Sequence, residues 1–237
     1  MKAISVKFVG GIALILAPLL RLLSMFLHPD EGADAATYAA ATAEPGWGIA
    51  HVVLVAFALL LALGFICLFA ALRKEDRSAL PLAGIFLMMG WAVPRFLGSA
   101  SDGFAAPLIA QRYLSSAGAA REAWGAYLMG NLDVALGTNA VGMVLFAGGL
   151  ALLSAAMLRA GLYNRFLAGT GVVLGLLYAA GYPLGMFGAY GETDAWFYYQ
   201  VATMVWSLAL GVVMLVTKPE TRTEPAARSS VQASAEA

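Results

Sequence analysis

Long apolar runs separated by short polar links dominate the chain, and they predict helices that cross a lipid bilayer. A hydrocarbon core of about 30 Å requires about 20 apolar helical residues. Six runs have about this length: 8–27, 48–72, 79–98, 134–158, 166–187 and 196–217. The pattern therefore predicts an all-α polytopic membrane bundle with six transmembrane helices within residues 1–217.

The basic residues of the links predict how these spans are oriented. Arg73, Lys74 and Arg77 follow the second run, and Arg159 and Arg165 lie between the fourth and fifth runs. The alternate links are mainly acidic. Because Lys and Arg accumulate in cytoplasmic loops, we expect the N-terminus and the C-terminus both to lie inside the cell.

Composition agrees with a membrane protein and excludes one class of partner. Hydrophobic residues make up 61% of the chain, charged residues 12%, and the mean hydropathy is +0.80. The formal net charge is zero, so no nucleic-acid partner is expected. The polar tail, 218–237, has no helical periodicity, and we expect it to be disordered in the cytoplasm.

The first run is also compatible with a secretory signal peptide. It has a basic start, an apolar centre and a small-residue site at Ala33-Asp34-Ala35. Its apolar region continues through Arg21 to Leu27, which is longer than the usual signal. An uncleaved first span is therefore favoured, and cleavage would leave five spans.

The acidic links carry shorter helical patterns of their own. Asp34 is a suitable N-cap for an alanine-rich helix that precedes the second run. Residues 107–114 and 119–129 also have helical patterns, separated by Ser-Ser-Ala-Gly. Trp124 belongs to an aromatic face in the second of these segments, so we expect that helix to lie flat in the headgroup region, as an anchor or a lid.

The fifth run contains the glycine spacing of closely packed membrane helices. Gly171 and Gly175 form a GxxxG pair, which allows two helix backbones to approach closely. The pair predicts a tight helix contact, including a contact with a helix of a partner protein.

The stretch 90–103 places a charge and a proline at the same depth of the third run. Trp91, Arg95 and Asp102 are spaced by four and seven residues, so a helix would bring them to one face, and the stretch ends in an acidic turn. Pro94 removes one backbone hydrogen bond, which a membrane tolerates where neighbours or water satisfy the freed carbonyl. The bundle is therefore expected to contain a polar pocket here.

The remaining polar residues of the spans lie in the same half of the predicted bundle. The candidate ligand pocket consists of Arg95, Trp91, Asp102, His51, Asp133, Asn139, Tyr182 and Arg21. Two interpretations stay open for Arg21 and Arg95. Their side chains extend to the outer headgroups, or they line the pocket with Arg95 paired to Asp102 or Asp133.

Two histidines flank the first acidic link, which also contains Asp30, Glu31 and Asp34. Histidine and carboxylate side chains together are typical metal ligands. However, His28 and His51 lack the i,i+4 spacing of a helical metal motif. The sequence therefore predicts no metal and no cofactor, and we interpret His51 as a hydrogen-bonded structural residue.

The second run opens with Trp47-Gly48-Ile49-Ala50-His51, after the acidic alanine-rich link and before the basic turn that ends near Arg73. Over the first three runs this arrangement resembles a family of uncharacterised bacterial six-span membrane proteins. The resemblance implies a six-span fold in the bacterial cytoplasmic (inner) membrane, and it implies no activity.

The sequence contains no HExxH, GxSxG or P-loop motif. The leading expectation is a non-enzymatic membrane protein that binds a membrane lipid or a small amphiphile in an outward-facing pocket, or an accessory protein of an envelope complex. One alternative is a membrane-embedded enzyme in which His51 is the acid/base and Arg95 or Arg21 orients the substrate. Another is a small transporter or channel.

Overall fold

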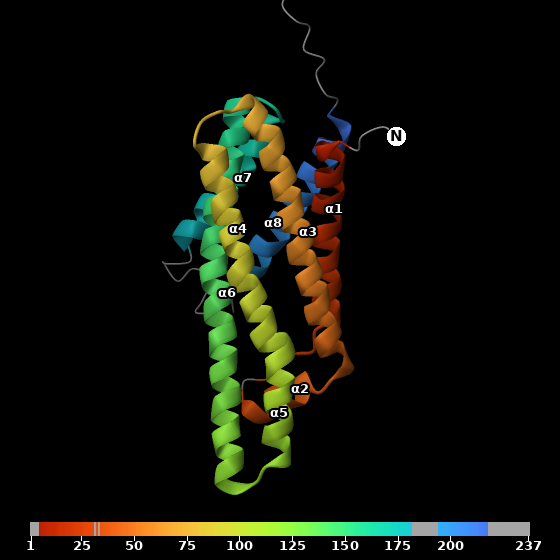
Figure 1. Ribbon diagram of the computed structural model, residues 1–237, viewed down its shortest axis with the longest axis vertical. Helices are drawn as coiled ribbons and strands as arrows, with labels where there is room; N and C mark the ends of the chain where they lie inside the picture. Colours follow the sequence, from red (N-terminus) through yellow and green to blue (C-terminus); the bar gives the residue numbers. More distant parts are fainter. Residues whose placement is uncertain (1–4, 31, 33, 182–193, 218–237) are drawn as a thin grey trace, which may run out of the picture.

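The computed structural model describes residues 5–30, 32, 34–181 and 194–217, and the regular elements in these ranges are all helices (Figure 1). They are α1 (Val6–Leu27), α2 (Ala35–Thr42), α3 (Pro45–Glu75), α4 (Leu80–Ser99), the π-helix η1 (Ala100–Ala105), α5 (Ala106–Ser115), α6 (Gly118–Ala160), α7 (Arg165–Gly181) and α8 (Asp194–Val216). Five helical stretches are long and apolar enough to cross a membrane, namely α1, α3, α4 to α5, α6 and α8. The all-α architecture is therefore confirmed, and its helices suit a multi-pass membrane protein.

The predicted fifth span is described only in part. α7 has 17 residues and ends at Gly181, so it is shorter than the five long helices. Residues 182–187 of the predicted span lie outside the described residues, as do Tyr182 and the tail 218–237. Six crossings therefore stay a prediction.

Six of the helices form a closed ring of neighbours. α1 packs against α3 and α8, α4 packs against α3 and α6, and α7 packs against α6 and α8. Buried residues from all six, including Leu14, Phe65, Met88, Leu150 and Trp206, make one hydrophobic core. The polar side chains that this ring directs inward therefore meet near its centre.

The predicted acidic turn after α4 is wrong, because the helix continues through η1 into α5. Pro107 has no backbone N–H, so the carbonyl of Gly103 has no donor four residues later. In the π-helix the pairing shifts by one residue, and the N–H of Ala106 donates to the carbonyl of Ser101. The wider turn keeps Asp102 beside the helix ring instead of in a loop.

The expected flat helix at 119–129 is also wrong, since these residues begin the 43-residue helix α6. At 1.5 Å per residue α6 is about 65 Å long, well beyond the thickness of a bilayer. The polar residue Asn131 lies inside this helix, and its side-chain oxygen accepts a hydrogen bond of 2.7 Å from the hydroxyl of Ser101. α6 ends at Gly161, whose positive φ of 62° makes it a left-handed cap.

α2, α5 and the first part of α6 form a small helical unit at one end of the molecule (Figure 1). Its hydrophobic core contains Tyr38, Trp47, Ile109, Tyr113 and Leu128. α2 begins where the sequence predicts, because the carboxylate of Asp34 caps it. This carboxylate accepts hydrogen bonds of 2.9 Å from the backbone N–H groups of Ala36 and Thr37. This unit covers the end of the ring at which His51 and Asp102 lie.

The glycine pair of α7 is used within the chain. A Cβ atom on Gly175 would lie 2.6 Å from the carbonyl oxygen of Ala147, and one on Gly171 would lie 2.2 Å from the hydroxyl of Ser154. Both glycines are buried against α6. The surface that we expected to receive a partner helix is therefore already covered by this chain.

Asp76, in the turn between α3 and α4, is expected to make the stability of the fold depend on pH. The bonds from Ser78, whose backbone N–H lies 2.8 Å from Oδ1, and the nearby charge of Arg159 lower the pKa of Asp76 below its ordinary 3.8. A lowered folded-state pKa stabilises the fold above the unfolded pKa, and this contribution is lost as the pH falls through the folded value. We expect the melting temperature of the wild type to approach that of Asp76→Asn between about pH 5 and about pH 2, measured by thermal denaturation in detergent. A difference that stays constant over this range would contradict the prediction.

Candidate ligand-binding site

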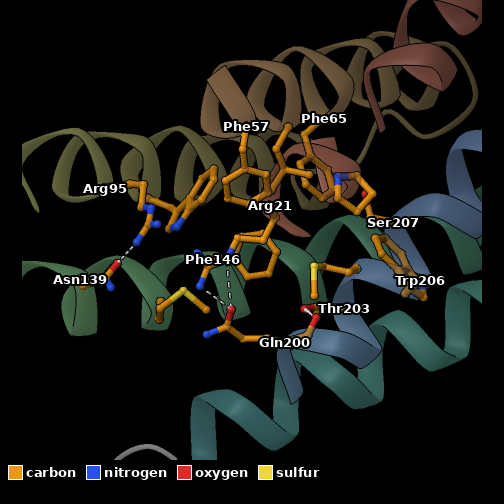
Figure 2. Close-up of a pocket in the computed structure, with 15 residues that line it drawn as sticks. Arg21, Phe57, Phe65, Arg95, Asn139, Phe146, Gln200, Thr203, Trp206 and Ser207 are labelled. Carbon is orange, nitrogen blue, oxygen red and sulfur yellow. Dashed lines mark hydrogen bonds between the residues drawn. The ribbon is translucent and has the colours of Figure 1, made fainter. Parts of the chain in front are cut away.

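Two adjoining cavities lie inside the helix ring, and Arg21, Arg95 and Asn139 line both of them. The first cavity has a volume of about 150 Å³ and is lined mainly by α1, α3, α4, α6 and α8 (Figure 2). The second, of about 410 Å³, extends toward the end of the ring that contains His28, His51 and Asp102. The two arginines thus stand between an aromatic cavity and a more polar one.

Arg21 points into the ring and joins α1 to α8 (Figure 2). Its Nε and Nη2 atoms donate hydrogen bonds of 3.3 Å and 2.9 Å to the side-chain oxygen of Gln200, and Nη1 donates one of 3.3 Å to the hydroxyl of Ser24. The side chain therefore lines the cavity and reaches across it to α8.

Arg95 is the second inward-facing cation, and its partner is not a carboxylate. Its Nη1 atom donates a hydrogen bond of 2.7 Å to the side-chain oxygen of Asn139. Within the described residues, no Asp or Glu oxygen lies within 4.0 Å of either arginine, so the expected pairing with Asp102 or Asp133 is not formed. The Nε of Arg95 and the Nε1 of Trp91 are buried donors that have no hydrogen-bond acceptor among the residues that the structure describes.

Aromatic side chains line much of the first cavity beside these charges. Phe57, Phe65, Trp91, Phe146 and Trp206 line the first cavity, and the rings of Trp91 and Phe146 lie 5.3 Å apart. They come from α3, α4, α6 and α8 and pack edge-on, tilted or stacked with centroid distances of up to 6.4 Å. The site therefore places hydrogen-bond donors with positive charge beside an apolar compartment.

A hydrogen-bond network connects the second cavity to the unit formed by α2. The Nδ1 of His51 donates to the carbonyl of Trp47 at 2.9 Å, and its Nε2 lies 2.9 Å from Oδ2 of Asp102. The hydroxyl of Tyr38 donates to Oδ1 of the same carboxylate, and the indole of Trp47 donates to the Asp102 backbone carbonyl at 3.1 Å. Because both ring nitrogens of His51 are engaged and only 1% of the residue is exposed, this geometry disfavours proton exchange between His51 and a substrate.

The structure brings six of the eight predicted pocket residues to these cavities: Arg21, His51, Trp91, Arg95, Asp102 and Asn139. Asp133 is exposed on α6 and lines neither cavity, and Tyr182 lies outside the described residues.

Several lining residues were absent from the predicted set. Gln200 has a sequence signal, because it is a polar residue in a predicted span. Phe57, Phe146 and Trp206 have none, since an aromatic residue in an apolar run is more often part of the core.

No protein-family model, curated protein or solved structure matches this chain.

Proposed function

We propose that this protein is a multi-pass membrane protein that binds a lipid or small amphiphile with an anionic headgroup. One observation carries the proposal: Arg21 and Arg95 point into the same pair of cavities, and among the described residues their hydrogen-bond acceptors are all neutral. A charged group removed from water is costly unless an opposite charge or a full set of hydrogen bonds compensates it. A carboxylate or phosphate supplies both.

The unused donors indicate where such a headgroup binds. The Nε–H of Arg95 and the Nε1–H of Trp91 are buried at the cavity without an acceptor among the described residues. Carboxylate and phosphate oxygens accept hydrogen bonds, and guanidinium groups bind them in a two-point geometry. The apolar part of the ligand then occupies the aromatic cavity, a division of roles typical of small-molecule sites.

The proposal includes a location, the bacterial cytoplasmic membrane, and an orientation with both termini inside and the cavities in the outer half. The turn between α3 and α4 and the turn between α6 and α7 lie at the same end as the start of α1 (Figure 1). Arg77 lies in the first of these connections, and Arg73, Arg159 and Arg165 lie at the helix ends beside the two connections. Basic residues gathered at one end support this orientation. No specific observation favours the accessory or transporter alternative.

Ligand binding is tested with the full chain in mild detergent. We expect oleate to bind more tightly than oleyl alcohol, which has the same chain and no charge. Arg95→Gln is expected to lower the oleate affinity by at least about tenfold, because a hydrogen bond to a charged group is lost. Isothermal titration calorimetry measures both affinities.

The matched control is Arg112→Gln, which removes one positive charge from the exposed surface of α5. We expect it to leave the oleate affinity unchanged. Equal affinities of the wild type for oleate and oleyl alcohol would reject the anionic headgroup, and equal oleate affinities of wild type and Arg95→Gln would reject this pocket.

A further inference from the structure

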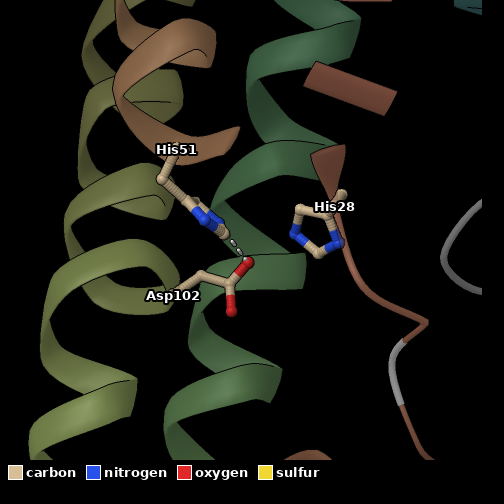
Figure 3. Close-up of side chains that lie close together, drawn as sticks. All are labelled: His28, His51 and Asp102. Atoms are coloured by element: carbon tan, nitrogen blue, oxygen red, sulfur yellow. Dashed lines mark hydrogen bonds and ion pairs between the residues drawn. The ribbon is translucent and has the colours of Figure 1, made fainter. Parts of the chain in front are cut away.

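Three side chains at the second cavity have the composition of a metal site. His28 follows α1, His51 lies in the second turn of α3, and Asp102 belongs to η1. One potential ligand atom from each lies within 4.8 Å of the others, and Figure 3 shows the three side chains converging from separate elements. These residues share the second cavity with Arg21 and Arg95, but none of them lines the aromatic first cavity.

Backbone carbonyls orient both imidazole rings. The Nδ1 of His51 lies 2.9 Å from the carbonyl of Trp47, and the Nδ1 of His28 lies 2.9 Å from the carbonyl of Pro29. A carbonyl oxygen only accepts, so each Nδ1 carries a proton and Nε2 is the nitrogen with ligand character. Metal-binding histidines are typically held in this way by an outer hydrogen bond.

Asp102 has a similar outer support. Its Oδ1 accepts a hydrogen bond from the hydroxyl of Tyr38, and its Oδ2 faces Nε2 of His51. The outer shell that fixes a ligand set, two carbonyls and a phenol, is therefore already present around all three side chains.

The contact between His51 and Asp102 requires a cation. With the proton of a neutral imidazole on Nδ1, Nε2 and the carboxylate Oδ2 are two acceptors only 2.9 Å apart. Either an extra proton or a metal ion relieves their repulsion. Zinc binds nitrogen and oxygen ligands at about 2.0 to 2.2 Å, so two ligands of a tetrahedral site lie about 3.4 Å apart, and Nε2 and Oδ2 would separate by about half an ångström on binding.

His28 favours the metal over the proton. A proton bridges two atoms, whereas a metal takes a third ligand, and the His28 ring lies 5.0 Å from that of His51. We propose that His28 Nε2, His51 Nε2 and Asp102 Oδ2 bind a divalent transition-metal ion of the zinc type, with a remaining coordination position open to the cavity.

The positive charges of Arg21 and Arg95 in the same cavity oppose a bound cation. The carboxylate of Asp102 is therefore essential to the affinity, more so than in a neutral cavity.

The test uses the full chain purified without a histidine tag, because the protein has only two histidines and both belong to the proposed site. After chelator treatment and dialysis against Zn²⁺, we expect one zinc per chain by elemental mass spectrometry. Asp102→Asn and His28→Gln are each expected to weaken zinc binding by more than about 100-fold. Asp133→Asn, the same substitution at an exposed position outside both cavities, is expected to bind zinc like the wild type.

Wild-type protein that binds no more zinc than Asp102→Asn would overturn the metal site and leave a proton-bridged ion pair. If Asp102→Asn does not fold, as judged by circular dichroism, His28→Gln decides alone, because His28 is only partly buried after the end of α1. Oleate binding is measured on the same samples. Wild-type protein that binds oleate but no zinc would overturn the metal site alone, whereas wild-type protein that binds zinc but prefers no anionic amphiphile would overturn the proposed function alone.

Discussion

Trp47→Ala is expected to lower the free energy of unfolding by about 3–5 kcal/mol, the usual cost of truncating a fully buried tryptophan. Only 1% of Trp47 is exposed, and its ring lies 4.6 Å from His28, 5.0 Å from His51 and 5.6 Å from Tyr38. Its indole also donates to the backbone carbonyl of Asp102. The residue therefore joins α2, the end of α1 and η1, and the cavity left by alanine would loosen all three. Chemical denaturation in detergent, followed by circular dichroism, measures the loss.

Trp47→Phe separates packing from hydrogen bonding. It keeps a large ring and removes the indole N–H, so we expect a loss of about 1 kcal/mol. If the alanine variant lost no more than the phenylalanine variant, packing at Trp47 would not be what holds the α2 unit to the ring.

Gly149→Ala is expected to destabilise the protein by about 1–3 kcal/mol through overpacking. A Cβ atom on Gly149 would lie 2.9 Å from the backbone nitrogen of Met88 and 3.0 Å from the carbonyl oxygen of Gly84. These are backbone atoms of α4, which cannot rotate away as a side chain can. The methyl group is accommodated only if α4 and α6 move apart, and that movement disturbs the wall of both cavities.

Gly137→Ala is the matched control in the same helix. Nothing lies within 4 Å of a Cβ atom at Gly137, so the variant gains helix propensity, about 0.5–1 kcal/mol, without a clash. The two substitutions are therefore expected to change stability in opposite directions. A stabilising Gly149→Ala would mean that the contact of α4 with α6 is looser than the structure shows.

Helix-forming apolar runs were predictable because their signal is local. The predicted spans 8–27, 48–72, 79–98 and 196–217 agree with α1, α3, α4 and α8 to within three residues at each end. A run of apolar residues without charge has few alternatives to a buried or membrane-spanning helix, and neither depends on which neighbour it meets. The cap of α2 at Asp34 was predictable for the same reason.

Helix continuation across polar segments was not predictable, because it depends on contacts with other helices. Asn131 precedes the predicted span 134–158, yet α6 passes through it, and Ser101 of η1 supplies hydrogen-bond partners for its side chain. Likewise Gly103 and Pro107 suggest a break. The helix passes through that segment as a π-helix, and its glycine lies so close to His51 that a Cβ atom would be 2.5 Å from the histidine ring.

The sequence by itself determined that the chain is helical and apolar, and that Arg21, His51, Arg95, Asp102 and Asn139 interrupt the predicted spans or their ends. Helical periodicity determines which residues share a face of one helix, and the depth at which they lie. It does not determine how helices rotate against one another.

Only the tertiary structure decided which polar side chains meet. It paired Arg21 with Gln200, 179 residues away, and Arg95 with Asn139 instead of a carboxylate. It also brought His28 to His51 and Asp102 from three separate elements. The physical reason is that side-chain packing between helices sets their rotation and separation, and that packing depends on the whole chain.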